Sequence, residues 1–141
     1  MRTALIALAA TVALGAAAVA DAKNFEPGDL RLCTGDRCVA ITNDGALRAL
    51  GAFYYVGRQP KVALPVRLGA RAYELRFRNG YVTGIVAGPR LDRFLSYGVY
   101  LERFRRGKWY AMPPRAAREL RRLAQDVPPR RLTRAALARS R

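Results

Sequence analysis

Apolar and polar residues alternate along residues 29–42 on either side of a polar turn. Alternation with a period of two predicts a β-hairpin, because successive side chains of a strand point to opposite faces. With the four residues between Cys33 and Cys38 as the loop, the two cysteines face each other across the strands. Leu32 then faces Val39, so the pattern places an apolar face on one side of this hairpin.

A second alternating segment spans residues 72–87 and contains Asn79-Gly80 near its middle. An Asn-Gly pair is typical of a two-residue type I′ turn, because both central positions of that turn need a positive φ. Pairing across such a turn sets Phe77 against Val82 and Arg76 against Thr83. The hairpin is therefore expected to have one core face and one solvent-exposed face. The core face consists of Tyr73, Leu75, Phe77, Val82, Gly84 and Val86.

Apolar residues at helical spacing predict two helices that pack on these hairpins. The first covers residues 43–56, where Asn43 or Asp44 can cap the start. The second covers residues 113–126 and opens with two prolines, which suit the first turn of a helix. Its buried stripe is expected to contain Ala116, Leu120, Leu123 and Val127, with Arg115, Arg118 and Arg122 on the outer face.

The remaining segments have weaker patterns. Residues 58–69 contain two prolines and are predicted to form an extended connector. Residues 89–97 are predicted as a short helix that Pro89 begins, with a continued strand as the alternative. A third hairpin is predicted from residues 99–105 and 108–112, with its turn at Arg106-Gly107.

The chain after the second pair of prolines, residues 130–141, is either a short docked helix capped by Thr133 or a loose basic arm. We therefore predict a small single α+β domain over residues 23–128, in which antiparallel β-hairpins pack against two or three helices. Residues 129–141 are assigned as a basic C-terminal tail or short helix.

The first 22 residues have a different pattern. Arg2 precedes an apolar, alanine-rich run, and small residues follow at A-x-A spacing. This order is typical of a cleaved secretory signal peptide, with cleavage after Ala20 or Ala22. The alternative is an uncleaved anchor, because the apolar run approaches the length of a membrane-spanning helix. We expect a secreted, periplasmic or cell-envelope protein with no transmembrane span after removal of the signal.

Export changes what the two cysteines indicate. In an oxidising compartment, Cys33 and Cys38 most simply form a structural disulfide within their hairpin. A redox pair is the rival interpretation, but the spacing is C-x4-C and not C-x-x-C. We predict no metal site, because two thiols without any histidine make a poor ligand set.

The charge is strongly positive and unevenly distributed. The chain has 26 Lys and Arg against 10 Asp and Glu, and 23 of the basic residues are arginines. A GC-rich genome explains a general excess of arginine, but 13 basic and two acidic residues lie after Glu102. This asymmetry favours an anion- or partner-binding surface in the C-terminal third. The candidate residues are Arg103, Arg105, Arg106, Lys108, Trp109, Arg115, Arg118, Arg122, Arg130, Arg131 and Arg134. A core position is the alternative for Trp109.

Catalytic groups are scarce in the sequence. There is no histidine, and the two serines, Ser96 and Ser140, lie outside a nucleophile-elbow pattern. The mid-chain acids Glu74, Asp92 and Glu102 each lie beside arginines and are expected to form surface ion pairs. We therefore predict no catalytic residue and no cofactor, although a carboxylate or tyrosine enzyme stays open as an alternative.

These features together predict an exported, non-catalytic binding module. It is expected to contact an anionic envelope polymer or lipid headgroups through its arginine-rich C-terminal third. The alternative is an exported module that binds a protein partner, as an inhibitor or an accessory subunit does. Binding to nucleic acid is expected only as a nonspecific effect in vitro, as for any chain this basic.

Overall fold

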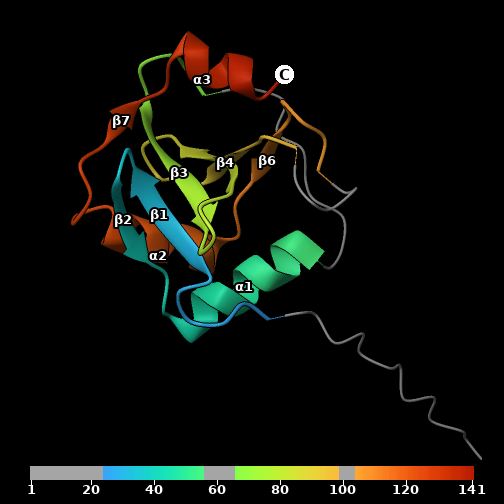
Figure 1. Cartoon of the computed structure of the whole chain (residues 1–141), viewed down its shortest axis with the longest axis vertical. Helices are drawn as coiled ribbons and strands as arrows, with labels where there is room; N and C mark the ends of the chain where they lie inside the picture. The colour runs from blue at the N-terminus through green and yellow to red at the C-terminus, as the bar shows by residue number, and fades with distance from the viewer. Residues whose placement is uncertain (1–23, 56–65, 99–103) are drawn as a thin grey trace, which may run out of the picture.

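A computed structural model describes residues 24–55, 66–98 and 104–141, and every structural statement below concerns these residues. They form an antiparallel seven-stranded sheet and three helices, which confirms the predicted α+β class (Figure 1). The elements are, in chain order, β1 (Leu30–Thr34), β2 (Arg37–Ala40), α1 (Asp44–Tyr55), β3 (Arg71–Phe77), β4 (Val82–Ala87), β5 (Arg93–Ser96), β6 (Trp109–Ala111), α2 (Pro114–Leu123), β7 (Arg130–Arg131) and α3 (Arg134–Arg139). The predicted signal peptide, most of the connector and the start of the predicted third hairpin lie outside the described residues.

The strand order in the sheet is β2-β1-β3-β4-β5-β6. β7 pairs with the first residues of β3, and β1 pairs with its later residues, so both strands share one edge of β3. The other edge of β3 is occupied by β4. The chain therefore returns at its C-terminus to the strand at the centre of the sheet.

The first hairpin has the predicted register. Cys33 pairs with Cys38 and Leu32 pairs with Val39, and a disulfide joins the two cysteines. Thr34 and Arg37 also pair, so the strands extend further into the turn than expected. The predicted disulfide within the hairpin is thus confirmed.

The turn of the second hairpin differs from the prediction. The Phe77 amide donates to the Tyr81 carbonyl at 2.8 Å, and the Gly80 amide donates to the Phe77 carbonyl at 2.8 Å. Three residues, 78–80, therefore form the loop, and Gly80 has a φ of 86° while Asn79 keeps a negative φ. The predicted two-residue type I′ turn is wrong, because a type I turn closed by a left-handed glycine accommodates the same Asn-Gly pair.

The longer turn is compensated by a β-bulge. The register shifts between Leu75 and Arg76, so that Arg76 pairs with Val82 and not with Thr83. Thr83 is the additional residue, and its hydroxyl lies 2.7 Å from the Tyr54 hydroxyl on α1. Val82 consequently packs on the opposite face of the sheet from the one predicted.

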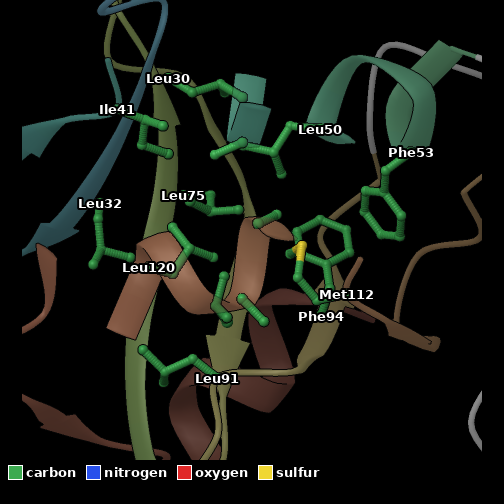
Figure 2. Packing of buried hydrophobic residues seen from close by; sticks show 14 of the residues in the cluster. Leu30, Leu32, Ile41, Leu50, Phe53, Leu75, Leu91, Phe94, Met112 and Leu120 are labelled. Atoms are coloured by element: carbon green, nitrogen blue, oxygen red, sulfur yellow. The ribbon is translucent and has the colours of Figure 1, made fainter. Parts of the chain in front are cut away.

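One face of the sheet carries the main core. α1 begins at the predicted cap, because the Asn43 side-chain oxygen accepts a hydrogen bond from the Ala46 amide at 2.9 Å. α2 begins at Pro114, and the four residues predicted for its buried stripe are all buried. Figure 2 shows how side chains from the strands interdigitate with those of both helices. The labelled residues are Leu30, Leu32, Ile41, Leu50, Phe53, Leu75, Leu91, Phe94, Met112 and Leu120.

The opposite face of the sheet is also covered, contrary to the prediction of a solvent-exposed face. A second apolar cluster lies there and is closed by Leu132 from the segment that carries β7 and α3. α3 is the short docked helix that was one of the two predictions, and the Thr133 hydroxyl caps it by accepting from the Ala136 amide at 3.2 Å. The buried members of this cluster are Ala72, Ile85, Ala87, Leu95, Tyr97, Trp109 and Leu132.

The predicted helix at residues 89–97 is wrong, because its second half is strand β5. Phe94 points into the main core and Leu95 into the second cluster, so both faces of this strand are buried. A strand buried on both faces has a continuous apolar run, which resembles helical spacing over a short segment. The predicted turn at Arg106-Gly107 is present, but the strand after it pairs with β5, with Leu95 opposite Trp109.

Candidate functional site

The outer face of α2 carries the predicted arginines. Arg115, Arg118 and Arg122 are exposed there, because the apolar stripe on the other side of the helix is packed into the core. Arg122 donates two hydrogen bonds to Glu119, from Nη2 at 2.6 Å and from Nε at 2.9 Å. These bonds favour the ionised carboxylate and so lower the pKa of Glu119 below its ordinary value.

Three open hollows meet along this side of the molecule. The first hollow lies between the start of α1 and the outer face of α2. The second lies at the start of α2, and Arg118 lines both of them. The second hollow shares Arg90 and Arg93 with a third, which extends to residues 66–70. Because neighbouring hollows share lining residues, we treat the three together and call them the arginine groove. Its arginines are Arg67, Arg90, Arg93, Arg115, Arg118, Arg121 and Arg122.

The charge of the groove is strongly positive. Seven arginines line it against two carboxylates among the described lining residues, which gives a local net charge of +5. Both carboxylates are already paired, Glu119 with Arg122 and Asp92 with Arg93 at 3.3 Å. The other five guanidinium groups form no ion pair with a described carboxylate. Four of the five are exposed and therefore available to bind an anion, namely Arg67, Arg90, Arg115 and Arg118.

Backbone contacts fix part of the groove. Arg121 Nη1 donates to the Arg90 carbonyl at 2.7 Å, which ties α2 to the connection between β4 and β5. The Met112 amide donates to the Asp92 carbonyl at 2.9 Å just before α2. These two contacts hold arginines from distant parts of the sequence in one surface.

A second predicted group lies elsewhere, at the turn between β5 and β6. Arg105 and Lys108 are exposed, whereas Arg106 donates to the Tyr97 carbonyl at 2.8 Å and to the Arg141 carbonyl at 3.3 Å. Trp109 is only 8% exposed and belongs to the second core cluster, which is the core position given as its alternative. Arg103 lies outside the described residues.

The third predicted group is on β7 and at the start of α3. Arg130 approaches Glu74, with 3.9 Å between Nη1 and Oε1, and Arg131 donates to the Gly69 carbonyl at 3.0 Å. Arg134 is exposed. The structure thus distributes the predicted basic residues over three surfaces, and only those on α2 lie in the arginine groove.

Four residues of the groove were not among the predicted site residues. Arg67, Arg90 and Arg93 precede the basic C-terminal third, and only the sheet topology brings them beside α2. Arg121 is half-buried on the flank of the helix. Helical periodicity was the available signal for Arg121, but no sequence pattern indicated the other three.

The acidic residues have different environments. Asp92 forms the expected ion pair, and Glu102 lies outside the described residues. Glu74 is 7% exposed, so its predicted surface position is wrong, and it pairs with Arg76 beneath the C-terminal segment. Within the described ranges, no three acidic, cysteine or histidine side chains come together as a metal site. No helix in that part of the chain is long and apolar enough to cross a membrane.

Comparison of the chain with protein-family models, with curated proteins and with solved structures finds no match.

Proposed function

We propose that this protein binds an anionic polymer of the cell envelope through the arginine groove. The observation that carries the proposal is a row of adjoining hollows lined by seven arginines, in which each described lining carboxylate already has its own arginine. A guanidinium group binds phosphate or carboxylate through two parallel hydrogen bonds. Such a groove suits a ligand that presents several anionic groups in a row.

An elongated polymer fits this surface better than a lipid bilayer. Membrane-surface binding usually combines basic residues with large apolar side chains that enter the headgroup region. Among the described residues, only Leu68 and Tyr81 are large, apolar and exposed, and Leu68 alone lines the groove. The predicted signal peptide and the disulfide support a location where envelope polymers occur.

The test compares two double variants that each remove two exposed positive charges. Arg90→Gln with Arg118→Gln changes the groove, and Arg31→Gln with Arg37→Gln changes the β1–β2 hairpin outside it. Binding of linear polyphosphate and of polygalacturonate is measured by isothermal titration calorimetry over a series of salt concentrations. Anionic phosphatidylglycerol vesicles serve as the lipid arm.

We expect the groove variant to bind polyphosphate about tenfold more weakly, because each lost contact removes roughly 0.7 kcal/mol of binding free energy. The slope of log affinity against log salt should fall by about two, since about one counterion is released for each contact. The control variant should change affinity by less than about twofold. Equal losses in both variants would contradict a specific groove, and binding to vesicles alone would replace the polymer with a membrane surface.

A further inference from the structure

A small cavity with a lining distinct from that of the arginine groove lies on the second face of the sheet. It has a volume of about 80 Å³, lies between the second face of the sheet and the segment that carries β7 and α3, and is partly open to solvent. Small side chains leave this space open, because Ala72 faces Ala135 and Ala136 across it. At roughly 15 Å³ for each water centre, the cavity has room for about five water molecules.

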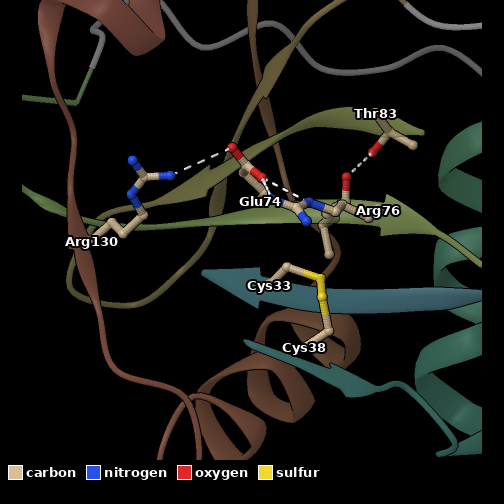
Figure 3. The surroundings of a disulfide bond; sticks show 7 residues. Cys33, Cys38, Glu74, Arg76, Thr83 and Arg130 are labelled. Carbon is tan, nitrogen blue, oxygen red and sulfur yellow. Dashed lines mark hydrogen bonds and ion pairs between the residues drawn. A yellow bond between two sulfur atoms is a disulfide. The ribbon is translucent and has the colours of Figure 1, made fainter. Parts of the chain in front are cut away.

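The side chain of Glu74 gives the cavity its polar character. Figure 3 shows its carboxylate between Arg76 on the same strand and Arg130 on β7. Arg76 donates both Nε, at 2.8 Å, and Nη2 to the same oxygen, Oε2. The other oxygen, Oε1, faces Arg130 Nη1 at 3.9 Å, which is beyond hydrogen-bond distance.

Oε1 therefore has acceptor capacity that faces the cavity. The Glu74 side chain is 9% exposed, and within the described residues no hydrogen bond reaches Oε1. Among the described side chains, Thr34 Oγ1 is the one fully buried polar atom without a partner, so Oε1 keeps access to water from the cavity. An N–H or O–H group of a ligand can take the place of that water. A ligand in this site is thus expected to place an N–H or O–H group beside Oε1.

The same site also favours a negative group. Arg130 and Arg139 line the cavity, whereas Glu74 is its only described carboxylate and is already paired with Arg76. The pKa of the Tyr97 phenol is raised to about 12, mainly by burial and also by the Glu74 charge, while the charges of Arg139 and Arg130 oppose the rise. All three charged groups therefore act on one phenol at the edge of the cavity, and a simple cation would be repelled by the arginines.

We infer that this cavity binds a small zwitterionic α-amino acid of the size of glycine or alanine. Its ammonium group donates to Glu74 Oε1, and its carboxylate accepts from Arg130 and Arg139. A methyl side chain packs against the alanines of the sheet and of α3. The Tyr97 hydroxyl, which donates to the Ala136 carbonyl at 3.1 Å, holds the helix over the sheet and so maintains the cavity.

The experiment uses the full chain and four probes: glycine, L-alanine, propionate and ethylamine. Isothermal titration calorimetry and the thermal midpoint in the presence of each probe report binding. We expect alanine to bind, and propionate and ethylamine to bind at least about tenfold more weakly, because each lacks one of the two charged groups. Equal responses to alanine and propionate, or no response to either amino acid, would overturn the inference.

Variants distinguish a built site from general charge. Arg139→Gln changes an exposed residue that lines the cavity, and Arg134→Gln changes an exposed arginine of the same helix that does not line it. Alanine affinity should fall about fivefold or more in the first variant and stay within about twofold in the second. Equal losses would show a nonspecific effect and contradict the site.

A further pair separates the ammonium contact from folding. Glu74→Gln removes the anionic acceptor, and Ala136→Leu fills the cavity while leaving Glu74 in place; both should abolish alanine binding. If Glu74→Gln does not fold, Ala136→Leu and Arg139→Gln still decide the question. Polyphosphate binding should be unchanged in Arg139→Gln, and alanine binding unchanged in the groove variant, so each proposal fails or stands independently of the other.

Discussion

Gly84 lies where the main core leaves no room for a side chain. It is the β4 residue that pairs with Leu75 on one side and with Ser96 on the other. A Cβ atom added to Gly84 would lie 2.2 Å from the Leu95 carbonyl oxygen and 2.7 Å from two carbons of the Phe94 ring. Neither neighbour can move easily, because Leu95 is backbone of a paired strand and the Phe94 ring is fully buried among other aromatic rings.

We therefore predict that Gly84→Ala destabilises the protein by about 3 kcal/mol, the upper end of the usual cost of overpacking. Restricting the unfolded chain recovers less than about 1 kcal/mol of this loss. At about 4 °C per kcal/mol for a domain of this size, the thermal midpoint should fall by about 12 °C.

The assay is thermal unfolding followed by far-ultraviolet circular dichroism, with Gly35→Ala as the control. Gly35 has a φ of 57° but nothing within 4 Å of its added Cβ, so its substitution reports backbone strain without a clash. That strain should cost about 1 kcal/mol and about 4 °C. A midpoint for Gly84→Ala no lower than that of the control would refute the packing argument.

Three further outcomes are expected. Replacing Cys33 and Cys38 together with alanine should lower the free energy of unfolding by about 2 kcal/mol in urea titrations, because the disulfide closes only a short loop; a loss below about 0.5 kcal/mol would contradict this. In the same titrations, Leu132→Ala should lower the free energy of unfolding by about 3 kcal/mol, because the Leu132 side chain is 2% exposed in the second cluster. A loss below about 0.5 kcal/mol, as for a surface residue, would mean that the C-terminal segment does not cover the sheet. Folding raises the pKa of Tyr97 to about 12 from its ordinary value of 10.0, so its contribution to stability is complete below pH 10 and is lost between pH 10 and pH 12. Between pH 9 and pH 11, the thermal midpoint should therefore fall less in Tyr97→Phe than in the unmodified protein. An equal fall in both proteins would exclude this linkage.

Local patterns predicted the elements that local interactions determine. The first hairpin and α1 have the expected register and cap, because cross-strand pairs and the Asn43 cap involve residues close in sequence. The turn at Asn79-Gly80 was predicted in the right place but with the wrong length. An Asn-Gly pair suits both turn types, and only the packing of Thr83 against α1 selects the bulged form.

Long-range contacts account for what the sequence did not predict. β5 resembled a helix because residues on both of its faces are buried, and its second face is buried only after the C-terminal segment returns to the sheet. Helical periodicity was sufficient to predict that Arg115, Arg118 and Arg122 lie on the outer face of α2. Arg67, Arg90 and Arg93 joined them only through the arrangement of the strands, which no local pattern encodes.

The return of β7 to the central strand also determines when folding can finish. The second cluster requires Leu132, and β3 keeps an unpaired edge until residues 130–131 lie beside it. A chain that emerges from the ribosome with its N-terminus first therefore cannot complete this part of the sheet until residues 130–132 have been synthesised.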